Sequence, residues 1–222
     1  KNIPQVKNSC QGNKACKSVA APATGVGGVA GTVGNIINSC NGDYSCYELG
    51  FNGGTVGYIE SSCTARHACN AIALDGGTVG NIKNSCTAYE ACRDLGETRG
   101  ASTVGTVGNI TSSCTSDSAC EVVAGFGGTV GNIVNSCNTA DNSCYFIGYG
   151  GVVGYIQDSC TEYNACYKMG YKGEVGNLQG SCVASDSCYY LAYNGGTVGN
   201  ILGSCLASES CYKVAYNGGT VG

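Results

Sequence analysis

Basic side chains are scarce in this sequence. Its 222 residues include 11 Lys and Arg, and the formal net charge is −4. Binding to nucleic acid needs a concentration of positive charge that neutralises phosphates, so a nucleic-acid partner is not expected. No stretch approaches the 18 apolar residues of a membrane-spanning helix, and the N-terminal residues lack the hydrophobic region of a signal peptide. We therefore expect no membrane span, and a mature or trimmed form if the protein is secreted.

Residues for catalysis are equally scarce. The chain has one histidine, His67, which cannot build more than one Ser/His/Asp or Cys/His arrangement, and we interpret it as a solvated loop residue. The carboxylates are scattered singly, whereas calcium binding or sugar cleavage requires several of them together. The sequence therefore predicts no enzyme, and no catalytic, cofactor-binding or metal site.

Large apolar side chains are few, but glycine and cysteine are abundant. There is no Trp, one Met and three Phe, against 37 Gly and 18 Cys. Most of the aliphatic bulk is Val and Ala, which argues against an ordinary globular core. Such a high and even number of cysteines is typical of a disulfide framework formed in an oxidising compartment. We therefore expect a secreted, extracellular protein.

The cysteines fall into nine couples that recur with a regular period. From first cysteine to first cysteine the steps are 30, 23, 23, 28, 23, 23, 22 and 23 residues. Insertions rich in small and turn-forming residues, at about 19–31 and 96–105, account for the two long steps. The sequence predicts a single repeat array over 1–222 with a 23-residue period.

Each unit follows the pattern G-T-V-G-N-I-x-x-S-C-x5-C-x-x-Φ, where Φ is an aliphatic residue. The Val and Ile columns are expected to face inward. They stand three residues apart, so a corner is expected at the intervening glycine, where a positive φ would cost little. The serine before each first cysteine is expected to form a buried ladder of hydrogen bonds. Thr87 and Glu90 suggest a helical turn, but other copies are less helical in composition, so one short helical turn or tight bend per unit is expected.

A disulfide within each couple would close a loop of about seven residues and stabilise the fold by roughly 2 kcal/mol. Bonds between adjacent coils and free buried thiols are the alternatives, and Cys-x5-Cys with one histidine is a poor match to zinc spacing. The expected disulfide cysteines are Cys10, Cys16, Cys40, Cys46, Cys63, Cys69, Cys86, Cys92, Cys114, Cys120, Cys137, Cys144, Cys160, Cys166, Cys182, Cys188, Cys205 and Cys211. The predicted fold class is thus all-β, a disulfide-stapled β-solenoid of about nine 23-residue coils, with one short helical turn or tight bend per coil.

The Cys-x5-Cys couple together with "GGTVGNI" resembles Cys- and Gly-rich repeats of uncharacterised secreted proteins from diatoms and related algae. The resemblance covers nearly all of the chain and implies no established function. In architecture the chain is similar to disulfide-stapled β-solenoids, among them insect antifreeze proteins. Those proteins have shorter coils and Thr-Cys-Thr triplets, which this sequence lacks.

Three outward features are candidates for binding. A Thr row suited to ordering water comprises Thr32, Thr55, Thr78, Thr106, Thr129, Thr197 and Thr220, with Val152 and Glu174 as interruptions. Two Tyr rows suited to glycans or to lateral contacts comprise Tyr145, Tyr167, Tyr189 and Tyr212, and Tyr149, Tyr171, Tyr193 and Tyr216. The Asn109–Thr111 sequence "NIT" is an N-glycosylation acceptor at a position expected to be exposed.

The sequence ends midway through a unit and begins with a partial one, so open strand edges are expected at both ends. We expect self-association, head-to-tail or lateral, into a rod, filament or surface coat. An ice-binding or glycan-binding solenoid, using the Thr row or the Tyr rows, is the alternative.

Overall fold

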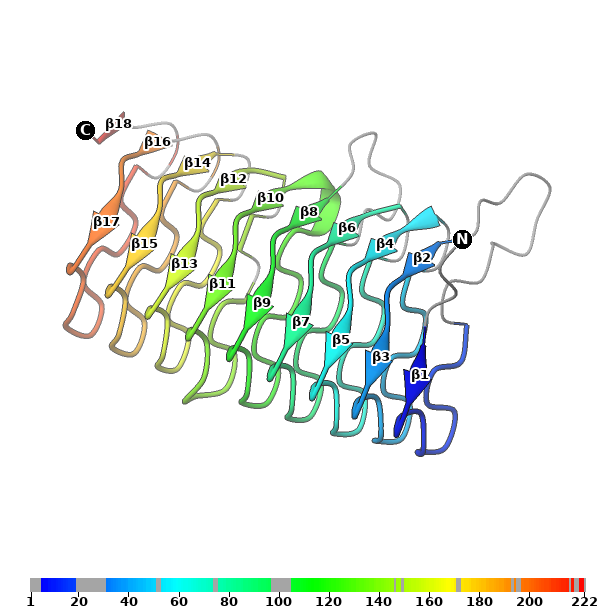
Figure 1. The fold of residues 1–222 in the computed structure, drawn as a ribbon. Helices are drawn as coiled ribbons and strands as arrows, with labels where there is room; N and C mark the ends of the chain where they lie inside the picture. The colour runs from blue at the N-terminus through cyan, green and yellow to red at the C-terminus, as the bar shows by residue number, and fades with distance from the viewer. Residues whose placement is uncertain are drawn as a thin grey trace.

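The computed structural model describes residues 5–18, 31–50, 53–73, 76–96, 105–145, 147–148, 150–170, 173–192, 194, 197–215, 217 and 220–221. The bodies of both expected insertions lie outside these residues. Figure 1 shows one repetitive body in which successive coils stack side by side along a single axis. We number the coils from the first to the ninth by their cysteine couples.

In the described part of the chain, eighteen two-residue strands form two parallel sheets of nine strands each. One sheet, sheet A, runs in the order β1 (Val6–Lys7), β3 (Ile36–Ile37), β5 (Ile59–Glu60), β7 (Ile82–Lys83), β9 (Ile110–Thr111), β11 (Ile133–Val134), β13 (Ile156–Gln157), β15 (Leu178–Gln179), β17 (Ile201–Leu202). The other, sheet B, contains β2 (Thr32–Val33), β4 (Thr55–Val56), β6 (Thr78–Val79), β8 (Thr106–Val107), β10 (Thr129–Val130), β12 (Val152–Val153), β14 (Glu174–Val175), β16 (Thr197–Val198), β18 (Thr220–Val221). The predicted all-β solenoid is confirmed.

The core lies between the two sheets and the cysteine couples. In the coil with β8 and β9, for example, Val107 and Ile110 are buried together with Cys114 and Cys120. Identical residues meet in register between coils, such as Ile110 with Ile133. A coil is too short to bury these side chains by itself, so the stacking of neighbours creates the core.

The corner between the strands requires glycine, but for a different reason from the one expected. Gly131, at this corner, does not have a positive φ. A Cβ atom there would instead lie 2.9 Å from the backbone nitrogen of Tyr155 in the next coil. The prediction of a positive φ at this corner is therefore wrong: the glycine permits close approach of two backbones. Positive φ is found at the next corner, at Gly76 with φ 98°.

The third side of each coil, around the cysteines, also pairs with its neighbours. Cys46 N–H donates to the carbonyl of Ala68 in the following coil at 3.0 Å, and Glu48 N–H donates to Lys17 in the preceding coil at 3.0 Å. Tyr44, Cys46 and Glu48 have φ of 55°, 51° and 65°. This left-handed backbone directs its hydrogen bonds between coils rather than within a helix.

In the described residues the segment around the cysteines is therefore the tight bend, and not the helical turn, of the two alternatives expected for each unit. A short 3-10 segment, η2 (Gly125–Gly127) with a non-helical Phe126, lies elsewhere, after the fifth cysteine couple. Left-handed conformation costs a residue with a side chain about 1–2 kcal/mol. The hydrogen bonds to both neighbouring coils and the disulfide hold these residues in place.

Candidate functional surfaces

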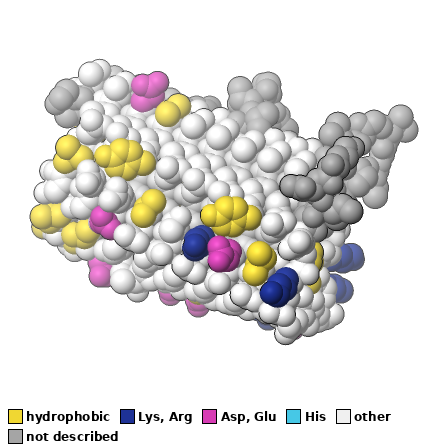
Figure 2. Space-filling view, viewed as in Figure 1, with side chains coloured by type: hydrophobic (Ala, Val, Ile, Leu, Met, Phe, Trp, Pro, Cys, Tyr) yellow, Lys and Arg dark blue, Asp and Glu magenta, His cyan; other side chains and the backbone are white. Residues whose placement is uncertain are grey.

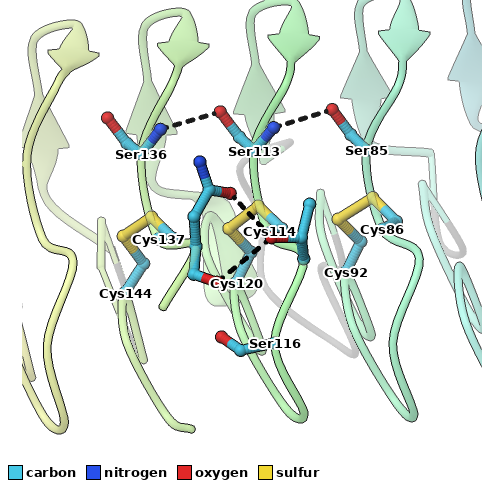
Figure 3. The surroundings of a disulfide bond; sticks show 12 residues. Ser85, Cys86, Cys92, Ser113, Cys114, Ser116, Cys120, Ser136, Cys137 and Cys144 are labelled. Carbon is cyan, nitrogen blue, oxygen red and sulfur yellow. Dashed lines mark hydrogen bonds between the residues drawn. A yellow bond between two sulfur atoms is a disulfide. The ribbon is translucent and has the colours of Figure 1, made fainter. Parts of the chain in front are cut away.

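The disulfides form a column along the interior of the solenoid. All nine couples are bonded within their own coil, with Cα–Cα separations from 5.4 to 5.7 Å, and no cysteine is free. Figure 3 shows three consecutive bridges, and sulfur atoms of Cys92, Cys114 and Cys120 lie within 4.8 Å of one another. Their sulfurs are oxidised, so they are not the thiolates that a zinc site requires. The bridges lie in the interior of the coils, where they stabilise the fold.

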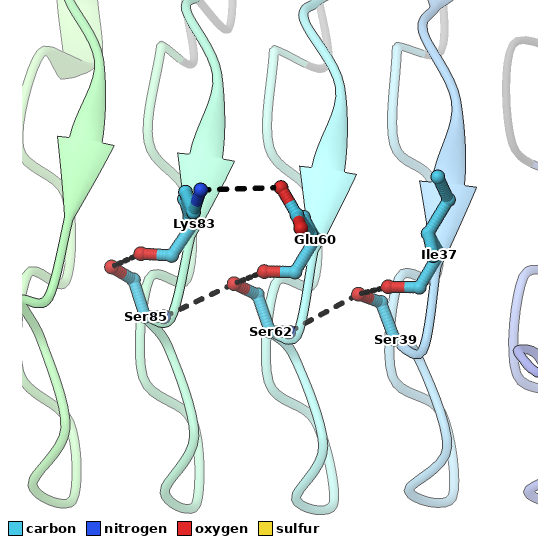
Figure 4. A network of polar contacts seen from close by, with 6 residues as sticks. All are labelled: Ile37, Ser39, Glu60, Ser62, Lys83 and Ser85. Atoms are coloured by element: carbon cyan, nitrogen blue, oxygen red, sulfur yellow. Dashed lines mark hydrogen bonds and ion pairs between the residues drawn. The ribbon is translucent and has the colours of Figure 1, made fainter.

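A serine ladder runs beside this column. The N–H of Ser113 donates to the Oγ of Ser85 at 3.1 Å, and the Oγ of Ser113 accepts from the N–H of Ser136 at 3.1 Å. The same hydroxyl donates to the carbonyl of Thr111 at 2.8 Å. Figure 4 shows this pattern in earlier coils, where the side chains of Ser39, Ser62 and Ser85 line up. From the second to the eighth coil, where the ladder serine is buried, the ladder therefore satisfies a buried hydroxyl and a buried amide.

An asparagine ladder, which sequence reasoning missed, runs along the corner between the sheets. The Oδ1 of Asn109 accepts from the backbone N–H of Asn81 at 2.8 Å, and the Oδ1 of Asn132 accepts from that of Asn109 at 2.8 Å. The recurrence of Asn directly after the corner glycine was the available signal. Asn109 itself is exposed, as expected for a glycosylation acceptor.

The Thr row lies on the outer face of sheet B. In each of its strands with a described pair of side chains, the first residue is exposed and the second is buried. Five threonines are in direct register, namely Thr32, Thr55, Thr78, Thr106 and Thr129. Exposed Val152 and Glu174 follow them before Thr197.

The first Tyr row is a continuous stack. Ring centroids of Tyr145 and Tyr167 are 5.4 Å apart, those of Tyr167 and Tyr189 4.8 Å, and those of Tyr189 and Tyr212 5.2 Å. Burial raises the pKa of the Tyr145 phenol. Stacking covers the ring faces of Tyr167 and Tyr189, and the ring of Tyr190 meets both of them edge-on at 6.5 and 4.3 Å. Glycan binding by this row stays a prediction.

Lysines flank this stack. Lys168 Nζ lies 5.0 Å from the ring centroid of Tyr167, and Lys213 Nζ lies 5.1 Å from that of Tyr212. These cation–π contacts add to a surface that is both aromatic and polar. The second Tyr row, Tyr149, Tyr171, Tyr193 and Tyr216, lies outside the described residues.

His67 is a partly exposed turn residue that also belongs to an aromatic cluster. Its ring stacks on Tyr44 at 5.0 Å and meets Tyr89 edge-on at 6.1 Å. The coil repeat places these three rings in neighbouring coils.

Charged side chains are sparse. Figure 2 shows them scattered over the viewed face, and the ion pair of Lys83 with Glu60 spans 3.6 Å between coils. Glu90 and Arg93 form a second pair at 3.0 Å. Burial raises the pKa of the nearby Glu121 carboxyl, while Arg93 partly opposes that effect.

Within the described residues, no helix has the length and apolar character needed to cross a membrane. Comparisons of the chain with protein-family models, curated proteins and solved structures found no match. The resemblance to algal repeat proteins therefore stays a prediction, and the functional argument depends on the geometry of the surfaces.

Proposed function

We propose that this chain is an extracellular structural repeat protein whose coils stack into rods that extend into filaments or a surface coat. The observation that carries the proposal is that neighbouring coils make the same contacts along the stack. Successive coils pair through equivalent backbone donors and acceptors and through the hydroxyl of the ladder serine, as Ser113 does with Ser136. A surface built in this way accepts a further coil of the same kind wherever one is offered.

The disulfides support an extracellular role. Nine bridges within 222 residues would be reduced in a cytosolic environment, and they substitute for the large core that the Val- and Ala-rich composition does not provide. Sparse charged side chains, several of them joined in ion pairs, and a core filled by side chains favour a mechanical role over catalysis. We accordingly propose no reaction for the protein.

Assembly of the purified, oxidised chain tests this function. Electron microscopy and fibre diffraction over a range of concentrations should give rods one coil wide, with a repeat of about 4.8 Å along the axis. Reduced, alkylated protein is the matched control and should give no rods, because the coils then lose their bridges. Oxidised protein that remains a monodisperse short monomer at high concentration would contradict the proposal.

A second candidate function is ice binding by the Thr row. The favouring observation is the unbroken register of the five threonines from Thr32 to Thr129 on an exposed strand surface. Parallel strands place their hydroxyl and methyl groups about 4.8 Å apart. We expect thermal hysteresis and ice shaping if this surface orders water.

A pair of variants from one coil tests ice binding. Thr106→Lys places a charge in the Thr row, whereas Thr111→Lys places it on the outward side of sheet A. Loss of hysteresis in the first variant but not in the second would support the Thr row. Absence of hysteresis in the unmodified protein would remove this candidate.

A further inference from the structure

Three tyrosines of the first Tyr row lie inside the stack, in the sixth, seventh and eighth coils. Tyr145, Tyr167 and Tyr189 each directly follow the second cysteine of their coil. Hydrogen bonds between the main chains run through the same positions: Lys168 N–H donates to the carbonyl of Tyr145 at 3.0 Å, and Tyr190 N–H donates to that of Tyr167 at 3.0 Å. The pairing of the backbones therefore sets the spacing of the rings.

The rings of these tyrosines are stacked with nearly parallel planes. Tyr167 and Tyr189 have an interplanar angle of 24° and a centroid distance of 4.8 Å, at the short end of the usual range for aromatic pairs. Equivalent positions and nearly parallel planes place the ortho carbons of one phenol beside those of the next. Both side chains are partly exposed, so a small oxidant has access to them and the rings have room to hinge toward one another.

The described coils have no covalent cross-link to their neighbours. All nine disulfides close within a single coil, and no cysteine is free to bridge two coils. Apart from the main chain, one coil is held to the next by hydrogen bonds and packing. The tyrosine stack is a place where side chains of neighbouring coils that can react with each other are held in contact.

We propose that Tyr167 and Tyr189 form an oxidative cross-linking site, at which a carbon–carbon bond between their rings joins the seventh coil to the eighth. The co-reactant is a one-electron oxidant of phenols, such as a peroxidase with hydrogen peroxide. The reaction takes place within one chain, so it goes beyond the proposed assembly and does not depend on it.

The reaction balances with one molecule of hydrogen peroxide for each bond. Each phenol loses one electron to the oxidant and one proton to water, and thereby becomes a neutral tyrosyl radical. The two radicals combine at their ortho carbons, and the hydrogen of each of these carbons then moves as a proton to the phenol oxygen. Hydrogen peroxide takes up the two electrons and two protons and becomes two molecules of water.

The protonated phenol is the form that reacts at neutral pH. Burial and the hydrogen bond with Tyr190 raise the pKa of the Tyr189 phenol above its ordinary value. The proton therefore leaves together with the electron, and partial exposure of Tyr189 lets water accept it.

Proximity favours this pair over tyrosines that are more exposed. Tyr58 and Tyr163 are 40% and 49% exposed, and in the described part of the chain neither ring contacts another aromatic ring. A radical on either of them must meet a second chain, whereas the stacked rings are held together at a high effective concentration. In a dilute solution, bonds within the chain should exceed bonds between chains at least about tenfold.

The neighbouring Tyr190 provides a matched control. Its ring meets that of Tyr189 edge-on, with an interplanar angle of 85°, and that of Tyr167 with an angle of 75°. It is therefore not in register with the stack, although it has the same phenol and is also partly exposed. We expect it to take little part in the reaction.

Treatment of the dilute, disulfide-bonded chain with a peroxidase and hydrogen peroxide tests the site. After reduction and digestion, mass spectrometry should find the peptides of Tyr167 and Tyr189 joined, at the sum of their masses less two hydrogen atoms. The product should migrate as a single chain. In Tyr189→Phe, which keeps the stacked ring, the yield of bonds between these two segments should fall at least about tenfold. Tyr190→Phe should leave the yield unchanged.

Circular dichroism and disulfide mapping establish that both variants are folded. Bonds that join separate chains through Tyr58 and Tyr163, with none between the seventh and eighth coils, would overturn the site, because exposure rather than stacking would then select the tyrosines. An equal loss in Tyr190→Phe and Tyr189→Phe would also overturn it. A chain that forms this bond but never assembles would retain the site and contradict the proposed structural function.

Discussion

The backbone N–H of Ser136 donates a 3.1 Å hydrogen bond to the side-chain Oγ of Ser113 one coil earlier. Both serines are fully buried. Because the same hydroxyl donates to Thr111 within its own coil, one oxygen atom fixes the local turn and the spacing to the next coil together. Its repetition gives a polar, directional component to a core otherwise made of Val, Ile and disulfides.

Removal of one ladder hydroxyl should destabilise the folded protein. Ser113→Ala leaves the buried N–H of Ser136 without its acceptor, and we expect the free energy of unfolding to fall by about 1–3 kcal/mol. Urea denaturation with the disulfides intact measures the change. Ser208→Ala, at an exposed position, should change stability little. Equal effects of the two substitutions would contradict the importance of the ladder.

Two glycines should respond differently to alanine. A Cβ atom at Gly128 would overlap the carbonyl of Gly148 in the next coil, whereas one at Gly180 would meet nothing within 4 Å. Gly180 has φ 56°, so its substitution should cost only the left-handed penalty, about 1–2 kcal/mol. Gly128→Ala should prevent normal stacking and lower the thermal midpoint much further. Similar midpoints for the two variants would refute this account.

Reduction of the native protein should proceed from the ends inward. Cys10, Cys16 and Cys211 are partly accessible, whereas both cysteines of the central couple Cys114–Cys120 are fully buried. A thiol reductant must reach a sulfur atom to exchange with it. Brief reduction followed by alkylation and peptide mapping should therefore label the first and ninth couples before the fifth. Simultaneous labelling of all nine couples would indicate reduction through global unfolding.

Protonation of Glu121 should favour the folded state. Burial raises its pKa above the ordinary 4.5, so the native protein binds this proton more tightly than the unfolded chain does. The stabilisation is complete below the unfolded pKa and is lost as the pH rises through the folded pKa. Glu121→Gln should thus be the more stable protein at pH 7 and lose that advantage in acid. Thermal unfolding at both pH values measures this, with exposed Glu162→Gln as control.

Asn109 should carry a glycan when the chain is expressed through a eukaryotic secretory pathway. Its Oδ1 is the atom that accepts the N–H of Asn81, so attachment at Nδ2 is compatible with the asparagine ladder. Asn132 occupies the same structural position but is followed at the second residue by Val134 instead of Thr111. Mass spectrometry should find the modification on Asn109 and not on Asn132. Complete absence of glycan at Asn109 would contradict the prediction.

The repeat made much of the fold predictable from the sequence. The period located the cysteine couples and the inward Val and Ile columns, because identical coils must present identical side chains to the core. The backbone around the cysteines was not predictable in the same way. Glu90 resembles the end of a helical capping box in the sequence, yet its φ is 53°. Hydrogen bonds from neighbouring coils determine that conformation, and these partners are about 23 residues away.

For the outer surfaces, the sequence predicted which side chains line up along the stack, but not the contacts between them. Position in the repeat was sufficient to place Thr106 outward, but it did not reveal that Tyr167 and Tyr189 stack face to face. Likewise, Asn109 was expected to be exposed, but the hydrogen bond from its N–H to the Oδ1 of Asn132 depends on the distance between coils. Side-chain contacts across coils need the stacking geometry as well as the pattern.

Because every bridge closes within its own coil, the oxidation of one coil does not have to wait for any other. During synthesis a bridge can form as soon as its segment of seven or eight residues emerges, without a distant partner. In evolution, a duplication or deletion of one 23-residue segment adds or removes both cysteines of a couple, so no cysteine is left without a partner. The length of the solenoid can therefore change by one coil at a time, while disulfide formation in the other coils stays the same.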